Sequence, residues 1–144
     1  MIVAEPRAEI AAWVAAMQGL PASDWGSYNA LALIKRGQIV GGVVYNNWNG
    51  AGVCAHIAGA GRRWLTREFL HAMFDYPFNQ CARRRITALV ARRNKHARAF
   101  IENLGFRYEG CVRHALPTDD WMLYGMLREE CRFLDRREPL RRAA

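Results

Sequence analysis

Two periods of hydrophobic residues alternate along the chain, and each change of period marks a change of element. Pro6–Gln18 carries an apolar stripe at helical spacing, which predicts an amphipathic helix with a proline in its first turn. After a loop at Pro21–Ser27, three apolar segments separated by short turn sequences predict an antiparallel meander. These predicted strands are Tyr28–Lys35, Gln38–Asn46 and Gly52–Ala58.

Helical and strand-like segments alternate beyond the meander. Arg62–Phe78 has helical spacing, and Arg85–Ala91 is a dense β-branched strand. Two further strands are predicted at Phe106–Leu116 and Trp121–Arg128, with the turn residues Pro117–Asp120 between them.

The segment Asn94–Gly110, NKHARAFIENLGFRYEG, joins a helix to a strand without a loop. Its apolar residues fall on one helical face, and Asn94 can cap the free amides of the first turn. Gly105 suits the left-handed position that ends a helix, and Phe106 at once begins a strand-like run. A strand–helix–strand unit places its two strands parallel, with the helix across one face of the sheet. The sharp junction therefore returns the chain to the edge of a sheet.

The composition is that of one globular domain, which we expect to span residues 1–134. A chain of 144 residues with 51% hydrophobic residues can bury a single core. No apolar run reaches the length of a membrane span and no cleavable signal is seen, so we expect a cytoplasmic protein without a membrane partner. The four cysteines form no CxxC pair and the histidines have no ligand spacing, so the sequence predicts no metal site.

The net charge is strongly positive. Lysine and arginine number 21 against 13 acidic residues, which gives +8. Such a surface attracts polyanions, anionic cofactors or acidic substrates. Part of the excess lies in residues 135–144, which we interpret as a solvated basic tail. The arginines are dispersed and no nucleic-acid-binding signature is present, so a nucleic-acid partner is not expected.

The pattern N-x-x-A-x-x-F-I-E-x-L-G-F-x-x-E-G at Asn94–Gly110, in this order of elements, resembles the GNAT N-acetyltransferase superfamily. It is similar to the branch that acetylates the N-termini of ribosomal proteins and related amines, and similar short sequences occur among phage-encoded acetyltransferases. The resemblance covers the chain from about Pro6 to Phe133. It implies an α/β (α+β) fold: a mixed, mostly antiparallel central sheet with a splayed parallel strand pair and flanking helices.

The resemblance also implies acetyl-CoA as a co-substrate, bound where Gly52–Ala58 and Arg85–Ala91 splay apart. The pantetheine arm would follow the free edge of the first of these strands, like an added strand. The pyrophosphate would lie on a Gly-rich turn at a helix N-terminus, where free amides and the helix dipole favour an anion. The binding residues implied in this way are Ile57, Ala58, Gly59, Ala60, Gly61, Arg62, Arg63 and Asn94.

This turn departs from the usual form in the family. HIAGAG at His56–Gly61 fits that form only if His56 takes its first position, and we interpret the loop as shortened, with His56 in the strand. Gly59 and Gly61 still allow the backbone to approach a phosphate, and Arg62 and Arg63 supply positive charge. The alternative is an ordinary turn before a helix, with Asn94 as an ordinary N-cap.

Acetyl transfer to an amine needs a neutral nucleophile, so a base must accept a proton. His56 is the candidate base, because strand alternation places it on a face with small residues and histidine titrates near neutral pH. The alternative is a hydrogen-bonded structural histidine. Tyr124 is a candidate acid, with simple packing as its alternative. Ile101 stands where many family members carry a tyrosine that acts as the acid.

These expectations combine into an acetyl-CoA-dependent N-acetyltransferase that acts by direct attack in a ternary complex. Its acceptor would be a primary amine on a small molecule or a protein N-terminus, and a homodimer is compatible with the resemblance. The alternative is a GNAT-fold binding module that has lost catalysis. The acceptor is not predicted, because the loops that bind it vary most in this fold.

Overall fold

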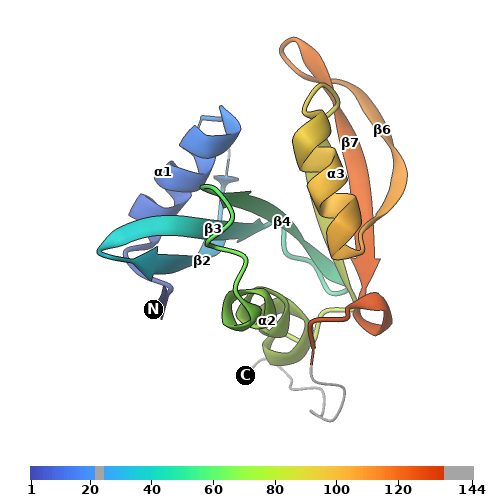
Figure 1. The fold of residues 1–144 in the computed structure, drawn as a ribbon. Helices are drawn as coiled ribbons and strands as arrows, with labels where there is room; N and C mark the ends of the chain where they lie inside the picture. The colour runs from blue at the N-terminus through green and yellow to red at the C-terminus, as the bar shows by residue number, and fades with distance from the viewer. Residues whose placement is uncertain (22–24, 135–144) are drawn as a thin grey trace.

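A computed structural model describes residues 1–21 and 25–134 (Figure 1). The predicted tail at 135–144 and part of the predicted loop Pro21–Ser27 lie outside the described residues. No helix in the described ranges combines the length and the apolar character that crossing a membrane requires. The elements in chain order are β1 (Ile2–Val3), α1 (Arg7–Gln18), β2 (Tyr28–Lys35), β3 (Gln38–Asn46), β4 (Gly52–Gly59), α2 (Arg67–Asp75), η2 (Tyr76–Gln80), β5 (Arg85–Ala91), α3 (Lys95–Leu104), β6 (Arg107–Leu116), β7 (Asp119–Leu127) and η3 (Arg128–Glu130).

The strands form one seven-stranded sheet in the order β1-β2-β3-β4-β5-β7-β6. Every neighbouring pair is antiparallel except β4 and β5, which are parallel. The predicted fold class, a mixed and mostly antiparallel sheet with flanking helices, is confirmed. The strand β6 runs parallel to β5, as the strand–helix–strand unit predicts, but β7 lies between them and β6 is the edge strand.

Helices cover both faces of the sheet. Val43 packs in the cluster that includes residues of α2 and α3, whereas its neighbour Val44 packs in the cluster that includes α1. Consecutive strand residues point to opposite faces, so α1 lies on one face and α2 and α3 lie on the other. Two adjacent glycines in β3 permit this close packing: a Cβ on Gly41 would lie 2.8 Å from Trp64 Cβ, and one on Gly42 would lie 2.9 Å from Val14 Cγ2.

The strand pair β4 and β5 is joined over only part of its length. Gly52–Ala55 pairs with Arg85–Ala88. Beyond these residues the two strands are not paired, although β4 continues to Gly59 and β5 continues to Ala91. The predicted splay of this parallel pair is therefore confirmed.

Helix α3 has the predicted ends. The Asn94 side chain accepts a hydrogen bond from the Ala97 N–H, and Gly105 adopts a left-handed conformation with φ 110°. The Gly105 N–H then closes the last turn on the carbonyls of Ile101 and Glu102. This glycine accounts for the abrupt change from helix to strand, because other residues adopt that conformation at a cost.

The predicted helix Arg62–Phe78 is shorter than expected. It begins at Arg67, where the Thr66 side chain caps it, and the regular α-helix ends at Asp75. A wider π-helical turn follows at Tyr76–Gln80 and contains a proline, which has no N–H to continue the α-helical pattern. The turn before β7 is also shorter than predicted, because β7 begins at Asp119 rather than Trp121.

Candidate active site

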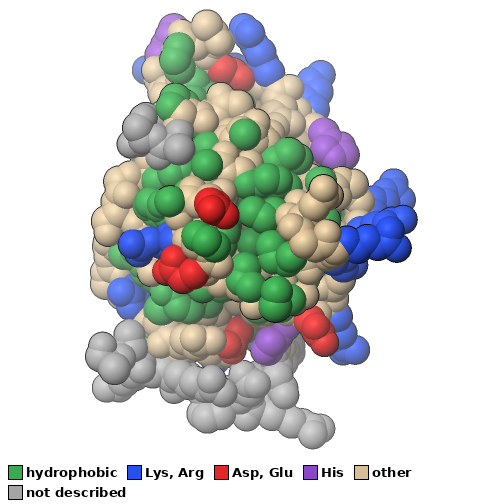
Figure 2. All heavy atoms as spheres, turned by 90° about the vertical axis from the view of Figure 1, so that its left-hand side faces the viewer, with side chains coloured by type: hydrophobic (Ala, Val, Ile, Leu, Met, Phe, Trp, Pro, Cys, Tyr) green, Lys and Arg blue, Asp and Glu red, His purple; other side chains and the backbone are tan. Residues whose placement is uncertain are grey.

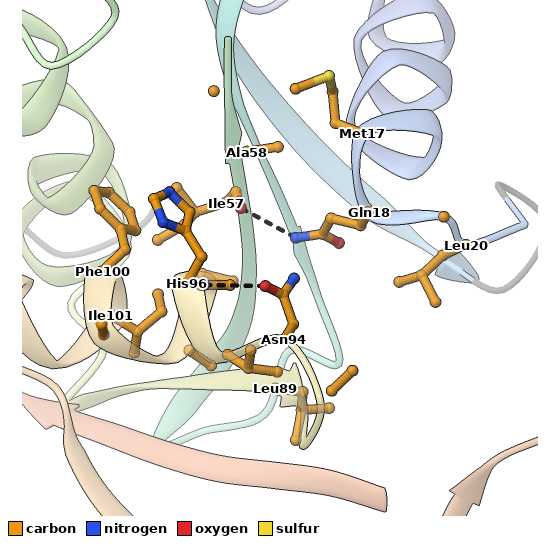
Figure 3. Close-up of a pocket in the computed structure, with 18 of the residues that line it drawn as sticks. Met17, Gln18, Leu20, Ile57, Ala58, Leu89, Asn94, His96, Phe100 and Ile101 are labelled. Carbon is orange, nitrogen blue, oxygen red and sulfur yellow. Dashed lines mark hydrogen bonds between the residues drawn. The ribbon is translucent and has the colours of Figure 1, made fainter. Parts of the chain in front are cut away.

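The splayed halves of β4 and β5 open onto a cavity with a volume of about 1130 Å³. Its lining comes from five places: the end of α1, the last part of β4 with the loop that follows, the last part of β5, one side of α3, and the turn between β6 and β7. Figure 3 shows α1 and α3 on either side of β4, with side chains from each element directed into the space between them.

The edge of β4 that faces this cavity carries hydrogen-bonding groups without a strand partner. The Ile57 carbonyl accepts a hydrogen bond from Gln18 Nε2 across 3.1 Å, as the dashed line in Figure 3 shows. The Ala60 N–H points the other way and donates to the Val40 carbonyl of β3. Because the backbone groups of alternate strand residues point to the same side, Ile57 and Gly59 present their N–H and C=O groups to the cavity.

The loop after β4 packs against a buried tryptophan, Trp64. The Trp64 indole is 5% exposed, and its Nε1–H donates to the Gly61 carbonyl at 3.0 Å. A Cβ on Gly59 would overlap the Trp64 ring, so only glycine fits there. Gly61 has φ +67°, with open space around it. In the described part of the chain, no hydrogen bond is donated by the backbone amides of residues 61–64.

Most of the residues that the resemblance implies for cofactor binding meet at this cavity. Those that line it are Ile57, Ala58, Gly59, Gly61, Arg62 and Asn94. Ala60 and Arg63 are not among the described residues of its lining. The helix does not begin directly at the glycine turn as predicted: α2 begins at Arg67, so the Trp64 turn separates its first amides from Gly61.

Positive charge gathers around this loop. Arg62 and Arg63 are both exposed, and Lys35 Nζ donates to the Arg63 carbonyl at 2.8 Å. Figure 2 shows the face that carries α1, where hydrophobic side chains spread across the middle and most of the lysine and arginine side chains lie along the right-hand edge, with others at the left. Free amides beside exposed arginines form a surface suited to an anion.

His56, the predicted base, has a buried side chain on β4 and is not among the described residues of the cavity lining. It is 6% exposed, its Nε2 lies 3.0 Å from Asn46 Oδ1, and its ring contacts the Trp25 ring at 4.5 Å between centroids. Burial lowers its pKa from 6.5 to about 4, so the ring is neutral at pH 7. An amide oxygen only accepts, so Nε2 carries the hydrogen and the lone pair is on Nδ1. This geometry matches the structural alternative for His56.

Tyr124, the predicted acid, also lies outside the described cavity lining. It is fully buried, and its hydroxyl donates to Glu102 Oε1 at 2.9 Å and accepts from Arg98 Nε at 3.2 Å. The hydroxyl therefore ties β7 to α3. The Tyr45 hydroxyl of β3 likewise has a structural partner, because it donates to the Met73 carbonyl in the core.

Two carboxylates on β6 and β7 also form polar contacts. Glu109 pairs with Arg85 at 2.7 Å. Asp119 lines the cavity at the β6–β7 turn and accepts from the Arg93 N–H at 3.0 Å, which lowers its pKa.

Sequence reasoning did not identify three of the side chains that line the cavity: Gln18, His96 and Trp121. Gln18 is the last residue of α1, and His96 lies in the first turn of α3 with its ring directed toward β4 (Figure 3). Trp121 follows the β6–β7 turn. Gln18 and Trp121 belong to no local motif, and His96 stands at a variable position of the Asn94–Gly110 pattern, so only the arrangement of the elements brings them together.

No family model matches the sequence, and a search of curated proteins also gives no match. Solved structures do match. A variant of the spermidine N-acetyltransferase SpeG from Vibrio cholerae superimposes with a TM-score of 0.71 at 15% identity, over 96% of this chain and 98% of that one. The ribosomal-protein-S5-alanine acetyltransferase from Vibrio fischeri gives 0.61 at 18% identity, over 72% of this chain and 63% of that one. At such identities the likeness establishes the fold: the chain has the fold of the GNAT acetyltransferases.

Proposed function

We propose that this protein is an acetyl-CoA-dependent N-acetyltransferase. One observation carries the proposal: the parallel pair β4–β5 is joined over four residues and then opens onto a cavity of about 1130 Å³. The free strand edge suits an extended chain of amide groups, and the loop beyond it suits a phosphate. Acetyl-CoA contains both parts in that order, as an acetyl-pantetheine arm followed by a pyrophosphate.

The residues that would hold acetyl-CoA follow from this match. The Ile57 N–H and the N–H and C=O groups of Gly59 would pair with the amides of the pantetheine arm, while the Ile57 carbonyl stays bonded to Gln18. The amides of residues 61–64, together with the side chains of Arg62 and Arg63, would bind the pyrophosphate. Asn94 caps α3 through its Oδ1, whereas its Nδ2 has no hydrogen-bond partner among the described residues and would donate into the cavity.

Direct attack by the acceptor amine fits the described lining better than an acyl-enzyme. None of the described lining residues is a cysteine or serine, and the hydroxyl among them is that of Thr118 at the exposed turn. In direct attack the amine nitrogen forms a bond to the acetyl carbon, the carbon–sulfur bond breaks, and one amine proton is lost while the sulfur leaves as a thiol. The acceptor would be a small molecule or a protein N-terminus.

His96 is the imidazole placed to exchange that proton. It lines the cavity and its ring points inward, whereas His56 is buried outside the described lining. A neutral imidazole carries one N–H donor and one lone pair, so it can accept one proton and deliver another. We infer that His96→Gln lowers kcat by a factor of about 100, within the usual range for general acid–base groups, and that His56→Gln does not remove a pH limb near neutrality.

The proposal is tested by two measurements on the same preparation. Calorimetric titration with acetyl-CoA reports binding, and thiol release in the presence of an amine panel reports transfer. Binding together with amine-dependent release is expected. Binding without release toward any amine would instead indicate a binding module that has lost catalysis, and absence of binding would contradict the assignment altogether.

A further inference from the structure

The cavity has a second half that acetyl-CoA would not fill. If the proposed function holds, the cofactor occupies the β4 edge, the loop after β4 and the start of α3. The remaining lining comes from the end of α1 and from the β6–β7 turn, and it is mainly apolar. Its hydrophobic members are Met17, Leu20, Pro21, Leu116, Pro117 and Trp121.

One polar group in this half has an unused acceptor. Gln18 donates from Nε2 to the Ile57 carbonyl, whereas its Oε1 is buried and has no hydrogen-bond partner among the described residues. Figure 3 shows the Gln18 amide between α1 and β4, directed into the cavity. Leaving a buried acceptor without a partner is costly, so a donor from a ligand is favoured there. The N–H of an amine is such a donor.

Negative charge is scarce in this half. Asp119 is the one carboxylate among the described lining residues, and its oxygens already accept from the N–H groups of Arg93 and Asp120. Cationic side chains line a neighbouring hollow on the same turn: Arg92, Arg93, Lys95 and Arg98. A ligand with several positive charges would meet repulsion here, with Asp119 as the one carboxylate among the described lining residues to offset it.

We propose that the acceptor is a small monoamine with an apolar body, a proposal that rests on the proposed function. Its nitrogen lies at Gln18 Oε1, close to the splayed edge of β4, and its apolar part packs against Trp121 and the end of α1. A polyamine lacks carboxylate partners in this half. A peptide N-terminus carries backbone N–H and C=O groups that find no hydrogen-bond partners on the apolar wall, and burying unpaired polar groups is costly.

The test compares three acceptors under one condition, with the full chain and saturating acetyl-CoA. They are 2-phenylethylamine, spermidine and a tripeptide of alanine, and the readout is kcat/KM from thiol release. We expect 2-phenylethylamine to exceed both others by about 10-fold or more, equivalent to about 1.4 kcal/mol of transition-state binding. Equal or better use of spermidine or the peptide would overturn the proposal, as would binding of acetyl-CoA without transfer to any of the three.

Calorimetry with acetyl-CoA separates this inference from the proposed function. Absence of acetyl-CoA binding overturns the proposed function and the acceptor assignment with it. Normal binding with a preference for spermidine overturns the acceptor assignment alone.

Variants of Trp121 and Gln18 test where in the cavity the acceptor binds. Trp121→Ala should raise KM for 2-phenylethylamine by roughly 10-fold and leave the acetyl-CoA Kd unchanged, while Trp121→Phe keeps an aromatic face if the alanine variant fails to fold. Gln18→Glu adds a carboxylate at the nitrogen position and should narrow the gap between 2-phenylethylamine and spermidine. Tyr108→Ala is the matched control, since this aromatic residue is 52% exposed on β6 and is not part of the described lining. An unchanged KM in Trp121→Ala would contradict the assigned position.

Discussion

The two halves of β4 differ in one respect. In the first half, Gly52–Ala55 pairs with β5 on one side. On the other side Cys54 and Ala55 pair with β3, and the Gly52 carbonyl accepts from the Asn49 N–H of the β3–β4 turn. In the second half, Ile57–Gly59 still pairs with Val43–Gly41 of β3, but the ladder to β5 has ended. The same strand is therefore an interior strand at one end and an edge strand at the other.

The difference arises because β4 and β5 each remain paired to the strand on their other side after the pairing between them ends. Leu89–Ala91 of β5 remains paired to Leu123–Trp121 of β7 while β4 remains paired to β3. The sheet thus divides into two parts that share one ladder of four residue pairs. The site is formed by omitting hydrogen bonds between two otherwise regular strands, and the unpaired edge is where an extended ligand can add.

The largest expected effect comes from filling the space at the end of the splayed half. In Gly59→Ala, the new Cβ would overlap the Trp64 ring, which is held by Gly41, Phe69 and Phe100. We expect the free energy of unfolding to fall by about 3 kcal/mol, the upper range for overpacking, and acetyl-CoA affinity to fall with it. Chemical denaturation measures the first change and calorimetry the second.

Gly61→Ala is the matched control for that variant. A Cβ at Gly61 meets nothing within 4 Å, and the cost is confined to the left-handed backbone, about 1 kcal/mol. Equal stability losses in the two variants would show that the Trp64 contact does not set the shape of the loop.

An effect of similar size is expected from His56, which lies on the splayed half but faces the α1 side. Its pKa is about 4 in the folded protein, against 6.5 when exposed, so between these values the unfolded chain binds more protons. Stability should therefore be constant above pH 6.5 and fall by about 3 kcal/mol as the pH drops to about 4. Denaturant titrations across this range measure the slope. If His56→Gln keeps the whole slope, the burial of His56 is not its cause.

The smallest effect separates two neighbouring arginines. Arg62 lines the cavity and Arg63 does not, although both are exposed. We expect Arg62→Ala to weaken acetyl-CoA binding by roughly 10-fold at low salt and Arg63→Ala to weaken it less, with both losses reduced at high ionic strength. Calorimetry at two salt concentrations measures both. A larger loss in Arg63→Ala would move the pyrophosphate away from the cavity.

Local sequence patterns predicted the regular elements well. The bounds of β2, β3 and β5 were predicted to the residue, and Asn94 and Gly105 marked both ends of α3. Two features depended on tertiary contacts instead. Helix α2 begins later in the chain than predicted because Trp64 turns into the core. The position of β7 between β5 and β6 was not predicted, because strand order is not a local property.

The candidate site was predicted less completely, for a physical reason. The backbone of Ile57–Gly61 and the cap Asn94 belong to contiguous motifs, so sequence could indicate them. Gln18 reaches the site because α1 ends opposite Ile57, which lies 39 residues away in the chain. The burial of His56 depends on Asn46 and Trp25, and strand alternation alone does not distinguish a cleft from a covered face.

Amide hydrogen exchange along β4, with and without acetyl-CoA, tests the central claim most directly. The Ile57 and Gly59 amides face the splayed edge, whereas the His56 and Ala58 amides face β3. If the pantetheine arm adds along this edge, acetyl-CoA should slow exchange at Ile57 and Gly59 and leave His56 and Ala58 unchanged. Acetyl-CoA that binds without slowing exchange at Ile57 and Gly59, or that slows all four amides equally, would contradict the account.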